Sequence, residues 1–278
     1  MPELSKKSVL ITGCSTGIGL CLAKGLQHRG YRVFAACRTK RDSTTLRQLG
    51  LQSPVIDLED TTSISDGLNQ VLEITGGELY GLINNGAYGQ PGAVEDLNRT
   101  TLRKQFETNV FGTQELTNKV IPIMRQADKG RIIQISSVLG FVCLKYRGAY
   151  NSSKYALEAL TDTMRLELSS TGIQLSLIEP GPIESDFRKN AYQMFKSNID
   201  FESSFHQSGY LGVEKRLLSG KPVRFTLPAE AVLKPTIHAL ENHNPKIRYR
   251  ITTPTKIFAI LKRLLSDRLM DRMLERDG

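Results

Sequence analysis

The sequence contains no long apolar run. A helix that crosses a bilayer needs roughly 20 consecutive apolar residues, and no stretch of this chain reaches that length. A β-branched run begins at Ser8, which leaves no room at the N-terminus for a signal peptide with its apolar stretch and cleavage site. We therefore expect a cytoplasmic protein that has no membrane-spanning segment.

Cysteine is scarce, and its spacing does not suit metals or disulfides. The four cysteines, Cys14, Cys21, Cys37 and Cys143, form no C-x-x-C pair and no Cys/His cluster with zinc spacing. We expect reduced thiols, no disulfide framework and no metal.

The chain also lacks a nucleic-acid signature, although its formal net charge is +9. Lysine and arginine are mostly scattered, with modest concentrations at residues 38–41 and in the C-terminal segment. A basic balance attracts phosphates of any kind, but no recognition-helix or RNA-binding motif accompanies it here. We expect no nucleic-acid partner.

Short β-branched runs alternate with amphipathic stretches from the start of the chain. Most runs are apolar on both faces, which is typical of central strands in a parallel sheet that is covered on both sides. The alternation predicts right-handed βαβ units and one doubly wound, three-layer α/β domain. The expected strands are Ser8–Thr12, Tyr31–Cys37, Pro54–Leu58, Leu79–Asn84, Arg131–Ser136, Ile173–Glu179 and a final edge strand, Lys246–Ile251.

Residues 183–226 break this rhythm, since they are polar and only weakly periodic. A long irregular segment in a compact domain is typical of a functional lid or of a disordered linker. Its aromatic and methionine side chains either line an apolar pocket or anchor the loop to the body. No cluster of Arg or Lys is expected in this segment to bind a carboxylate or phosphate, and His206 is expected to be a surface residue. The side chains in question are Phe187, Tyr192, Met194, Phe195, Phe201, Phe205 and Tyr210.

The C-terminal segment is amphipathic and basic, and we expect one helix over Thr255–Glu275. Its apolar residues fall on one side, and basic residues occupy the remaining positions. Such a helix either packs on its own protein, packs across a dimer interface, or lies on an anionic membrane. The apolar residues are Ile257, Ile260, Leu261, Leu264 and Leu265.

The first run leads directly into a glycine-rich turn and then a helical pattern. This order predicts a dinucleotide phosphate site, in which Gly13 permits the tight turn, Gly17 lets the backbone approach the pyrophosphate, and Gly19 allows close helix–strand packing. The N-terminus of the following helix offers free N–H groups to the phosphates. The predicted cofactor-binding residues of this turn are Gly13, Cys14, Ser15, Thr16, Gly17, Ile18 and Gly19.

The end of the second run favours NADP(H) over NAD(H). A carboxylate at this point would accept the ribose 2′-hydroxyl, whereas an arginine accommodates a 2′-phosphate. Arg38 follows the run, and no carboxylate occurs before Asp42. We expect Arg38 to contact the phosphate, with Lys40 or Arg41 as possible helpers, although a solvated basic loop has the same sequence.

Tyr150 and Lys154 are four residues apart at the start of a helical pattern and so share one helix face. An ammonium near a phenol lowers the pKa of the phenol, which makes Tyr150 a usable proton donor and acceptor. Ser137 stands at the end of the preceding strand, on the sheet edge where open α/β folds bind ligands. The pattern Y-x-x-x-K alone is common by chance. The position of Ser137 at the end of the preceding strand makes it stronger evidence for a catalytic site.

Together these motifs resemble the short-chain dehydrogenase/reductase family, in its short form with T-G-x-x-x-G-I-G. Further motifs match in order over roughly residues 7–190. Asn84-Asn85-Gly86-Ala87 stands where the family has Asn-Asn-Ala-Gly, with the last two residues exchanged, which affects the local backbone fit rather than the chemistry. The other matches are Asp57, Asn109 in the segment N-V-F-G-T, Ser137, Tyr150 to Lys154, and Pro180-Gly181-Pro182-Ile183.

The resemblance implies a Rossmann-type fold and a role for each matching residue. Tyr150 would be the acid/base, and Lys154 would hold the ribose hydroxyls and lower the Tyr150 pKa. Ser137 would hydrogen-bond the substrate oxygen, and Asn109 would hold a water molecule in the proton relay. Asp57, with Leu58 beside it, would contact the adenine, and Asn85 would line the cofactor cleft. Near the nicotinamide amide the implied contacts are Pro180, Gly181, Ile183 and Ser185, the last where threonine is common.

Residues 178–183 and 249–254, with the basic C-terminal segment, resemble one subgroup more closely. It contains bacterial NADP-dependent aldehyde reductases and relatives of hydroxysteroid and retinol dehydrogenases, which implies an apolar carbonyl substrate. We expect an NADP(H)-dependent oxidoreductase that acts on CH–OH groups. We expect it to form a homo-oligomer, a dimer or a tetramer, and its C-terminal helix is a candidate for peripheral membrane contact. The alternatives are an NADP(H)-sensing regulatory protein without turnover, and an epimerase or dehydratase on the same scaffold.

The expected organisation is a dehydrogenase/reductase domain over residues 1–254, followed by the C-terminal helix over 255–278. Within the domain we expect a cofactor half (1–130), a catalytic half (131–182) and the substrate lid (183–226).

Overall fold

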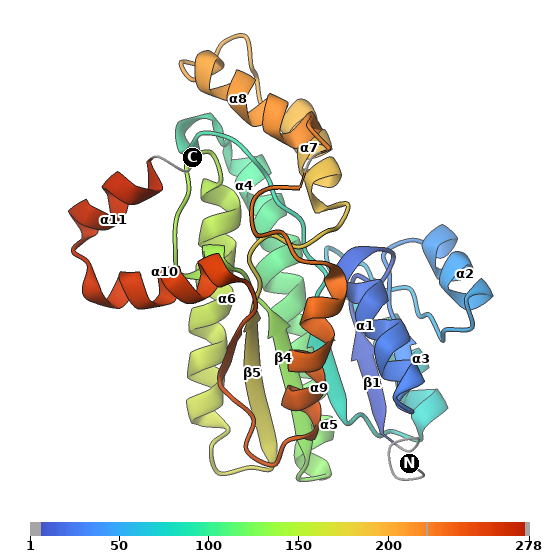
Figure 1. Cartoon of the computed structure of the whole chain (residues 1–278). Helices are drawn as coiled ribbons and strands as arrows, with labels where there is room; N and C mark the ends of the chain where they lie inside the picture. Colours follow the sequence, from blue (N-terminus) through green and yellow to red (C-terminus); the bar gives the residue numbers. More distant parts are fainter. Residues whose placement is uncertain (1–6, 221, 276–278) are drawn as a thin grey trace.

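Six parallel strands form one sheet at the centre of the molecule, in the order β2-β1-β3-β4-β5-β6 (Figure 1). The computed structural model describes residues 7–220 and 222–275. The order reverses direction between β1 and β3, as in a doubly wound sheet. The strands are β1 (Ser8–Ile11), β2 (Arg32–Ala35), β3 (Gly81–Asn84), β4 (Gly130–Ile135), β5 (Ile173–Glu179) and β6 (Arg248–Arg250).

Helices cover both faces of the sheet, so the fold has the three layers that the sequence predicts. The main helices are α1 (Gly17–His28), α2 (Lys40–Gln48), α3 (Thr61–Thr75), α4 (Arg99–Phe106), α5 (Thr113–Gln126), α6 (Gly148–Glu167), α7 (Phe187–Asn198), α8 (Gln207–Leu218) and α9 (Leu233–Glu241). Shorter helical turns are η1 (Val94–Asp96), η2 (Glu107–Gly112), η3 (Val138–Gly140) and η4 (Ala229–Val232).

Alternate residues of the central strands enter two separate cores. In β1, Val9 and Ile11 pack with residues of α1 and α9, whereas Leu10 packs on the opposite face with residues of α3, α5 and α6. All residues of β1, β3 and β4 are buried. Burial on both faces explains why these runs are continuously apolar.

The expected strand over Pro54–Leu58 does not form, and this prediction was wrong. The segment makes only isolated parallel bridges to β2 and its extension, Phe34 to Gln52 and Cys37 to Val55. Pro54 has no N–H to donate to a ladder, so regular pairing is interrupted beyond the edge strand β2.

The lid (residues 183–226) was expected to be irregular, but it contains α7 and α8, which lie together beyond the carboxyl ends of the strands (Figure 1). Each helix buries few residues: Ala191 and Phe195 in α7, and Tyr210 and Val213 in α8. Two buried positions per helix make a stripe too short to give a clear period in the sequence.

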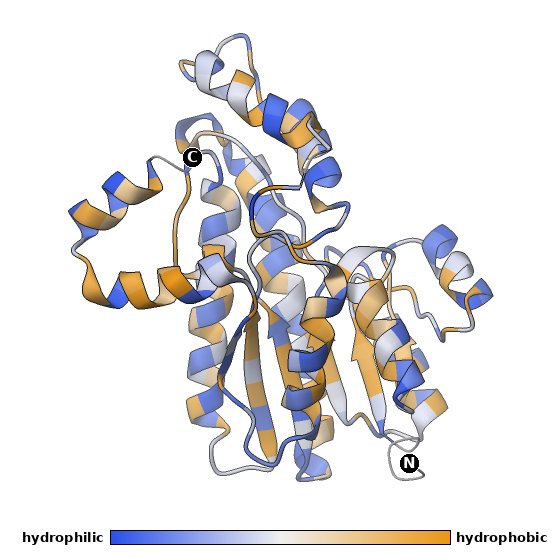
Figure 2. Ribbon diagram, in the orientation of Figure 1, coloured by the Kyte–Doolittle hydropathy of each residue, from blue (hydrophilic) through white to orange (hydrophobic). Residues whose placement is uncertain are grey.

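The C-terminal segment forms two helices rather than one: α10 (Thr253–Leu264) and α11 (Asp267–Leu274). Leu265 is extended between them, and Ser266 followed by Asp267 is a favourable helix start. Residues 276–278 of the predicted helix lie outside the described residues. In Figure 1 both helices project from the body, and Figure 2 shows hydrophobic residues along α10.

The apolar face of α10 is not covered by the described part of the chain. Ile257, Ile260 and Leu264 are 48%, 59% and 75% exposed, while Ala259 is buried against the body. Packing of this face on its own protein, one of the three alternatives, is therefore not observed. Among residues 7–220 and 222–275, no helix is long and apolar enough to cross a membrane.

Candidate active site

The glycine-rich loop connects β1 to the start of α1. Gly13 and Gly17 have φ angles of 68° and 57°, a region that favours glycine. A Cβ on Gly19 would overlap the carbonyl oxygen of Gly13. As far as the structure describes the chain, the N-cap residue Thr16 makes no capping hydrogen bond with its side chain. The first N–H groups of α1 are therefore available to an anion.

Residues of this loop differ in what they present to a ligand. Ser15 and Thr16 are exposed, whereas Ile18 packs against the core. Cys14 is fully buried: its thiol donates to the Ile11 carbonyl at 3.2 Å and its N–H to the Ala36 carbonyl at 2.9 Å. Cys14 thus shapes the loop, and its polar hydrogens are committed within the protein.

Asn85 joins the end of β3 to the glycine-rich loop. Its side-chain amide donates to the carbonyl oxygens of Thr12 and Gly13, both at 3.0 Å. The Thr12 hydroxyl in turn accepts hydrogen bonds from the N–H groups of Asn85 and Gly86, at 3.0 and 2.9 Å. The loop is consequently fixed before any ligand binds.

Arg38 is exposed on the loop between β2 and α2. Burial and the charge of Glu59 raise the pKa of Tyr88 to about 12, and the charge of Arg38 opposes this rise, so Arg38 lies near Tyr88. Asp42 is already engaged: its carboxylate accepts from the Thr39 hydroxyl at 2.8 Å and its N–H donates to that hydroxyl at 3.1 Å. Thr39 therefore caps α2, and the Asp42 carboxylate is engaged with the hydroxyl of that cap.

Three of the predicted catalytic residues lie together where α6 crosses the carboxyl end of β4. Tyr150 and Lys154 are on α6, and the ammonium of Lys154 is 5.8 Å from the centre of the Tyr150 ring. The ammonium donates to the Ile135 carbonyl at 2.7 Å. Ser137 follows β4, and its hydroxyl lies near Tyr150, where it lowers the pKa of the phenol.

Asn109, the fourth predicted residue, lies in the π-helical turn η2 between α4 and α5. Its side chain is 1% exposed and holds the backbone of Tyr88: the amide donates to the Tyr88 carbonyl at 3.0 Å, and the oxygen accepts from the Tyr88 N–H at 3.1 Å. The amide also donates to the Ser153 hydroxyl on α6 at 3.1 Å. Asn109 thus connects η2 to the helix that carries Tyr150. Single π-helical turns occur frequently at functional sites.

Burial dominates the ionisation of the site. Burial raises the pKa of Tyr150 to about 12, against the Ser137 hydrogen bond and the Arg147 charge, which both lower it. Burial also lowers the pKa of Lys154 to about 8, while the carboxylate of Glu158 raises it. The sequence predicts Lys154 as the cation that lowers the Tyr150 pKa, but in this structure that cation is Arg147.

The remaining predicted cofactor residues surround the same edge of the sheet. Asp57 accepts from the Glu59 N–H at 3.1 Å, and Leu58 is buried. The Pro180 carbonyl accepts from the Val138 N–H at 2.8 Å, and Gly181 lies against the Thr252 hydroxyl. Ile183 forms a parallel bridge with Leu227. The exposed Ser185 packs on Gly17, which brings the start of the lid to the phosphate loop.

Most lid aromatics anchor the lid rather than face the reaction centre. Phe195 and Tyr210 are buried with their ring centroids 5.1 Å apart, and Phe201 packs on Tyr210. Phe187 is the exception, because its ring meets the edge of Tyr150 at 5.3 Å. Phe205 is 91% exposed. His206 is the N-cap residue of α8 without a side-chain capping hydrogen bond, and its ring contacts Glu95 at 2.5 Å.

Sequence reasoning missed three residues that hold the site together. Thr12 and Ser153 lie beside or within recognised motifs, so the sequence could locate them near the site. Their hydrogen-bond partners could not be predicted, because those partners belong to elements that are distant in sequence. Arg147 has no spacing signal at all. Its influence on Tyr150 follows from its place at the N-cap of α6, three residues before the tyrosine.

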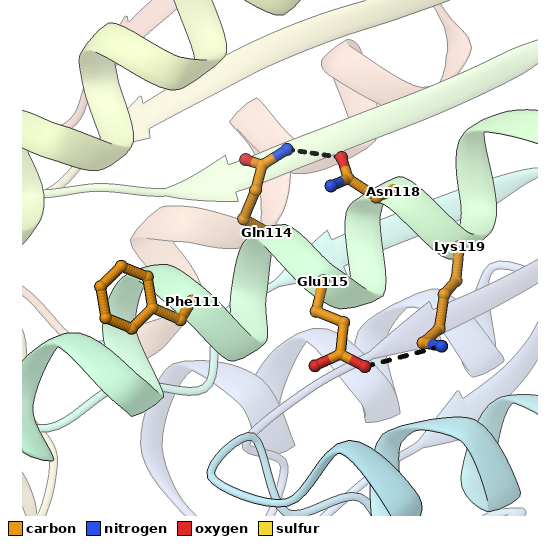
Figure 3. Close-up of a pocket in the computed structure, with 5 residues that line it drawn as sticks. All are labelled: Phe111, Gln114, Glu115, Asn118 and Lys119. Atoms are coloured by element: carbon orange, nitrogen blue, oxygen red, sulfur yellow. Dashed lines mark hydrogen bonds and ion pairs between the residues drawn. The ribbon is translucent and has the colours of Figure 1, made fainter.

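A separate hollow lies on the outer face of α5 and contains none of the predicted catalytic residues (Figure 3). Its lining residues are Phe111, Gln114, Glu115, Asn118 and Lys119. Asn109 is buried while Phe111 is 52% exposed, so this hollow lies away from the site. Among the described residues, no group of three or more His, Cys, Asp or Glu side chains is placed to hold a metal ion.

Comparison with known proteins places the whole chain in one family. The family model of short chain dehydrogenases matches residues 7–195. The chain is 39% identical over 273 residues to the uncharacterized oxidoreductase YbbO of Escherichia coli (strain K12), covering 98% of this chain and 96% of that protein. It is 31% identical over 282 residues to retinol dehydrogenase 16 of Rattus norvegicus, covering 98% and 88%.

The fold agrees with this assignment. A short chain dehydrogenase/reductase from Burkholderia phymatum, solved in complex with NAD, matches with a TM-score of 0.77 and 23% identity over 94% of each chain. The sequence and the fold therefore agree that the chain belongs to the short chain dehydrogenase family of nicotinamide-dependent oxidoreductases.

Proposed function

We propose that this protein is an NADP(H)-dependent oxidoreductase that interconverts an alcohol and a carbonyl compound with a largely apolar body. The observation that carries the proposal is the placement of Tyr150 and Lys154 on one face of α6, with the Lys154 ammonium 5.8 Å from the centre of the tyrosine ring and bound to the Ile135 carbonyl at the end of β4, just before Ser137. In this proposal residues 1–130 hold the cofactor, 131–182 supply the chemistry, and the lid over 183–226 covers the substrate.

The residues present fit a dinucleotide. The uncapped N-terminus of α1 offers N–H groups to the phosphates, and a side chain at Gly17 would contact Ser185 and narrow the loop. Arg38 would hold the 2′-phosphate, since it is exposed after β2 and the nearby Asp42 carboxylate is engaged by the hydroxyl of Thr39, the N-cap residue of α2. When bound, the nicotinamide supplies or accepts the hydride.

The chain's own residues manage the proton and the substrate oxygen. Ser137 and Tyr150 together form a pair of hydroxyls that can bind one carbonyl oxygen. With its pKa near 12, Tyr150 is protonated at neutral pH, the form that donates a proton to an oxygen during reduction. Lys154, held by Ile135, lies below the ring and is placed to bind the ribose hydroxyls.

An apolar substrate is supported by Phe187, which packs on the Tyr150 ring, and by the relative that is named a retinol dehydrogenase. Each extra methylene buried in such a site strengthens transition-state binding by up to about 0.8 kcal/mol. We expect kcat/KM to rise along a series of straight-chain aldehydes until the pocket is full. A flat or falling series would contradict the apolar pocket.

The alternative is an NADP(H)-sensing regulatory protein without turnover. It is disfavoured because Asn109, Ser137, Tyr150 and Lys154 are all present, whereas a sensor needs only the cofactor site. Incubation of the purified protein with NADPH and a panel of carbonyl compounds separates the two. NADPH consumption above the rate of a Tyr150→Phe control supports the enzyme, and tight NADPH binding without consumption supports the sensor.

We further propose a homo-oligomer, a dimer or tetramer, through the outer face of α5 and α6. Leu166 on α6 is 65% exposed, Phe111 in η2, just before α5, is 52% exposed, and a groove runs between α5 and α6. Light scattering should give a mass of two or four chains. Phe111→Asp should shift it toward the monomer, whereas Phe205→Asp, outside this face, should not.

The exposed face of α10 supports peripheral contact with an anionic membrane. Ile257, Ile260 and Leu264 are exposed, and Lys262 and Arg263 lie beside them. We expect the protein to sediment with vesicles that contain phosphatidylserine, and the double variant Ile260→Asp/Leu264→Asp to remain in solution. If wild type and the double variant sediment with the vesicles to the same extent, this face does not bind the membrane, and a dimer interface is the remaining role for it.

A further inference from the structure

A chain of hydrogen bonds connects the lid helix α7 to Asn109. It begins at Asn198, the last residue of α7, whose side-chain amide donates to the side-chain oxygen of Gln90 at 2.7 Å. The side-chain amide of Gln90 donates in turn to the carbonyl of Met194, also in α7, at 3.4 Å. Gln90 lies between β3 and η1, so these two bonds fasten α7 to the loop that follows β3.

Gln105, in α4, continues the chain from Gln90 to Asn109. Its side-chain oxygen accepts from the Gln90 N–H at 2.8 Å, and its amide donates to the Tyr88 carbonyl at 2.9 Å. The same carbonyl accepts from the Asn109 amide at 3.0 Å. Gln105 precedes Asn109 by about one helical turn, since α4 continues directly into η2. Two side chains from one helical face therefore hold one carbonyl.

The members of this chain are buried, so water does not replace a bond that is lost. Gln90, Gln105 and Asn109 are all 1% exposed or less. A buried amide or carbonyl without its partner is unfavourable, and hydrogen bonds in a series reinforce one another. If α7 moves away, the side-chain oxygen of Gln90 loses the Asn198 bond in a place with little access to solvent. The position of α7 and the order of the chain are consequently linked.

The chain lies beside the catalytic tyrosine. The Ser153 hydroxyl, which accepts from the Asn109 amide, donates to the Tyr150 carbonyl at 2.8 Å. Gly89 lies between Tyr88 and Gln90, and a Cβ on it would be 2.7 Å from the ring of Phe187 and 3.6 Å from the ring of Tyr150. The same short segment thus contacts the first residue of α7 and the catalytic tyrosine.

We propose that Gln90 and Gln105 are positioning residues that couple the seating of α7 to the position of Asn109, so that the lid and the proton relay reach their working arrangement together. The proposal rests on the proposed function and on the relay role that the family resemblance implies for Asn109. Neither glutamine is placed at the reacting atoms: Gln105 acts through Asn109, and Gln90 acts through Gln105. Contacts between a substrate and α7 would then raise kcat as well as affinity.

Removal of the Gln105 amide tests the link to the relay. Gln105→Met keeps the length of the side chain and removes both hydrogen bonds, and Gln193→Met, at an exposed position of α7, is the matched control. With a medium-chain aldehyde, we expect kcat of Gln105→Met to fall by about tenfold to a hundredfold, since a shift of about 1 Å in a catalytic group has such an effect. KM should change less, and Gln193→Met should behave as wild type. Circular dichroism and melting curves establish that each variant is folded.

Gln105→Glu separates positioning from a general loss of stability. A protonated carboxyl group accepts from the Gln90 N–H and donates to the Tyr88 carbonyl, as the glutamine does, whereas a carboxylate has no proton to donate. Burial raises the pKa of a carboxyl group, so the protonated form gains as the pH falls. Relative to wild type, kcat of Gln105→Glu should recover as the pH falls from about 8 to about 6, and kcat of Gln105→Met should not. The same profile in both variants contradicts the positioning role.

Hydrogen exchange tests the coupling without turnover. Asn198→Ala removes the bond at the lid end of the chain, and Ser204→Ala removes a comparable bond of 2.6 Å between the lid and Asp96, which has no part in the chain. Asn198→Ala should speed amide exchange in residues 105–113 and lower kcat. Ser204→Ala should speed exchange only around residues 200–210.

The outcomes separate the coupling from the proposed function. The proposal is overturned if Asn198→Ala leaves exchange in residues 105–113 at the wild-type rate, or if Gln105→Met keeps the wild-type kcat. If exchange responds as expected but wild type reduces no carbonyl compound, the proposed function fails and the coupling of α7 to Asn109 stands. If wild type reduces carbonyl compounds and neither variant differs from it, the coupling alone fails.

Discussion

The ammonium of Lys154 donates a hydrogen bond to the carbonyl oxygen of Ile135 at 2.7 Å. This bond ties α6 to the carboxyl end of β4, where Ser137 follows, and it holds a buried cation beneath the Tyr150 ring. A backbone carbonyl attracts the ammonium without neutralising it, so the charge remains available to the ribose of a bound cofactor. The relative positions of Ser137, Tyr150 and Lys154 are thus set by the backbone.

Tyr150→Phe should reduce turnover and leave cofactor binding intact. The substitution removes the hydroxyl that transfers the proton, a step that positioned acids and bases accelerate by about 10²–10⁴-fold. Measurement of kcat with an aldehyde, and of NADPH affinity by the change in NADPH fluorescence, separates the two effects. Retention of more than about a tenth of the wild-type kcat would assign the proton donor to another group.

The pH profile should report Lys154. Its pKa is lowered to about 8, so the ammonium is charged below that pH and neutral above it. Tyr150, with a pKa near 12, keeps its proton over the same range. We expect NADP(H) affinity to weaken as the pH rises through about 8.

Lys154→Arg provides the control, because a guanidinium keeps its charge throughout this range. The weakening above pH 8 should disappear in this variant, whatever its affinity at pH 7. An identical pH profile in both proteins would mean that a different group titrates.

Arg38→Ala should weaken NADPH and spare NADH. Loss of a charge-assisted contact to the 2′-phosphate corresponds to about 1.5–3 kcal/mol, roughly ten- to a hundredfold in dissociation constant. NADH lacks this phosphate and is the internal control. Equal dissociation constants of wild type for NADPH and NADH would refute the assignment of Arg38.

Tyr210→Phe should loosen the lid. The Tyr210 hydroxyl accepts from the Ala93 N–H at 2.8 Å and donates to Asp96, in a residue that is 0% exposed. Removing it leaves the Ala93 N–H unpaired and takes one hydrogen bond from Asp96, which keeps the bond from the Ser204 hydroxyl; the loss costs about 1–3 kcal/mol. The melting temperature should fall and KM should rise more than kcat changes, whereas Phe205→Ala, at an exposed position, should behave as wild type.

The central part of the fold could be predicted from sequence because the pattern of each βαβ unit is contained in a short stretch of the chain. Runs such as Arg131–Ser136 are apolar on both faces, and the glycine turn after Ser8–Thr12 has fixed spacing. The same local signals located Ser137, Tyr150 and Lys154. The strand expected at Pro54–Leu58 failed for an equally local reason, the missing N–H of Pro54 at a sheet edge.

The lid helices could not be predicted in this way. Helices α7 and α8 bury only two residues each, so the period of their buried residues is too weak to see in the sequence. The break between α10 and α11 depends on a single extended residue, Leu265.

The most direct test of the account follows the hydride itself. Wild type is incubated with NADPH that is deuterated at both C4 positions, together with a medium-chain straight-chain aldehyde, and the product is analysed by mass spectrometry. The account predicts an alcohol that carries one deuterium on the former carbonyl carbon, formed in proportion to the NADPH consumed. Unlabelled alcohol, or unchanged aldehyde beside tightly bound NADPH, would contradict it.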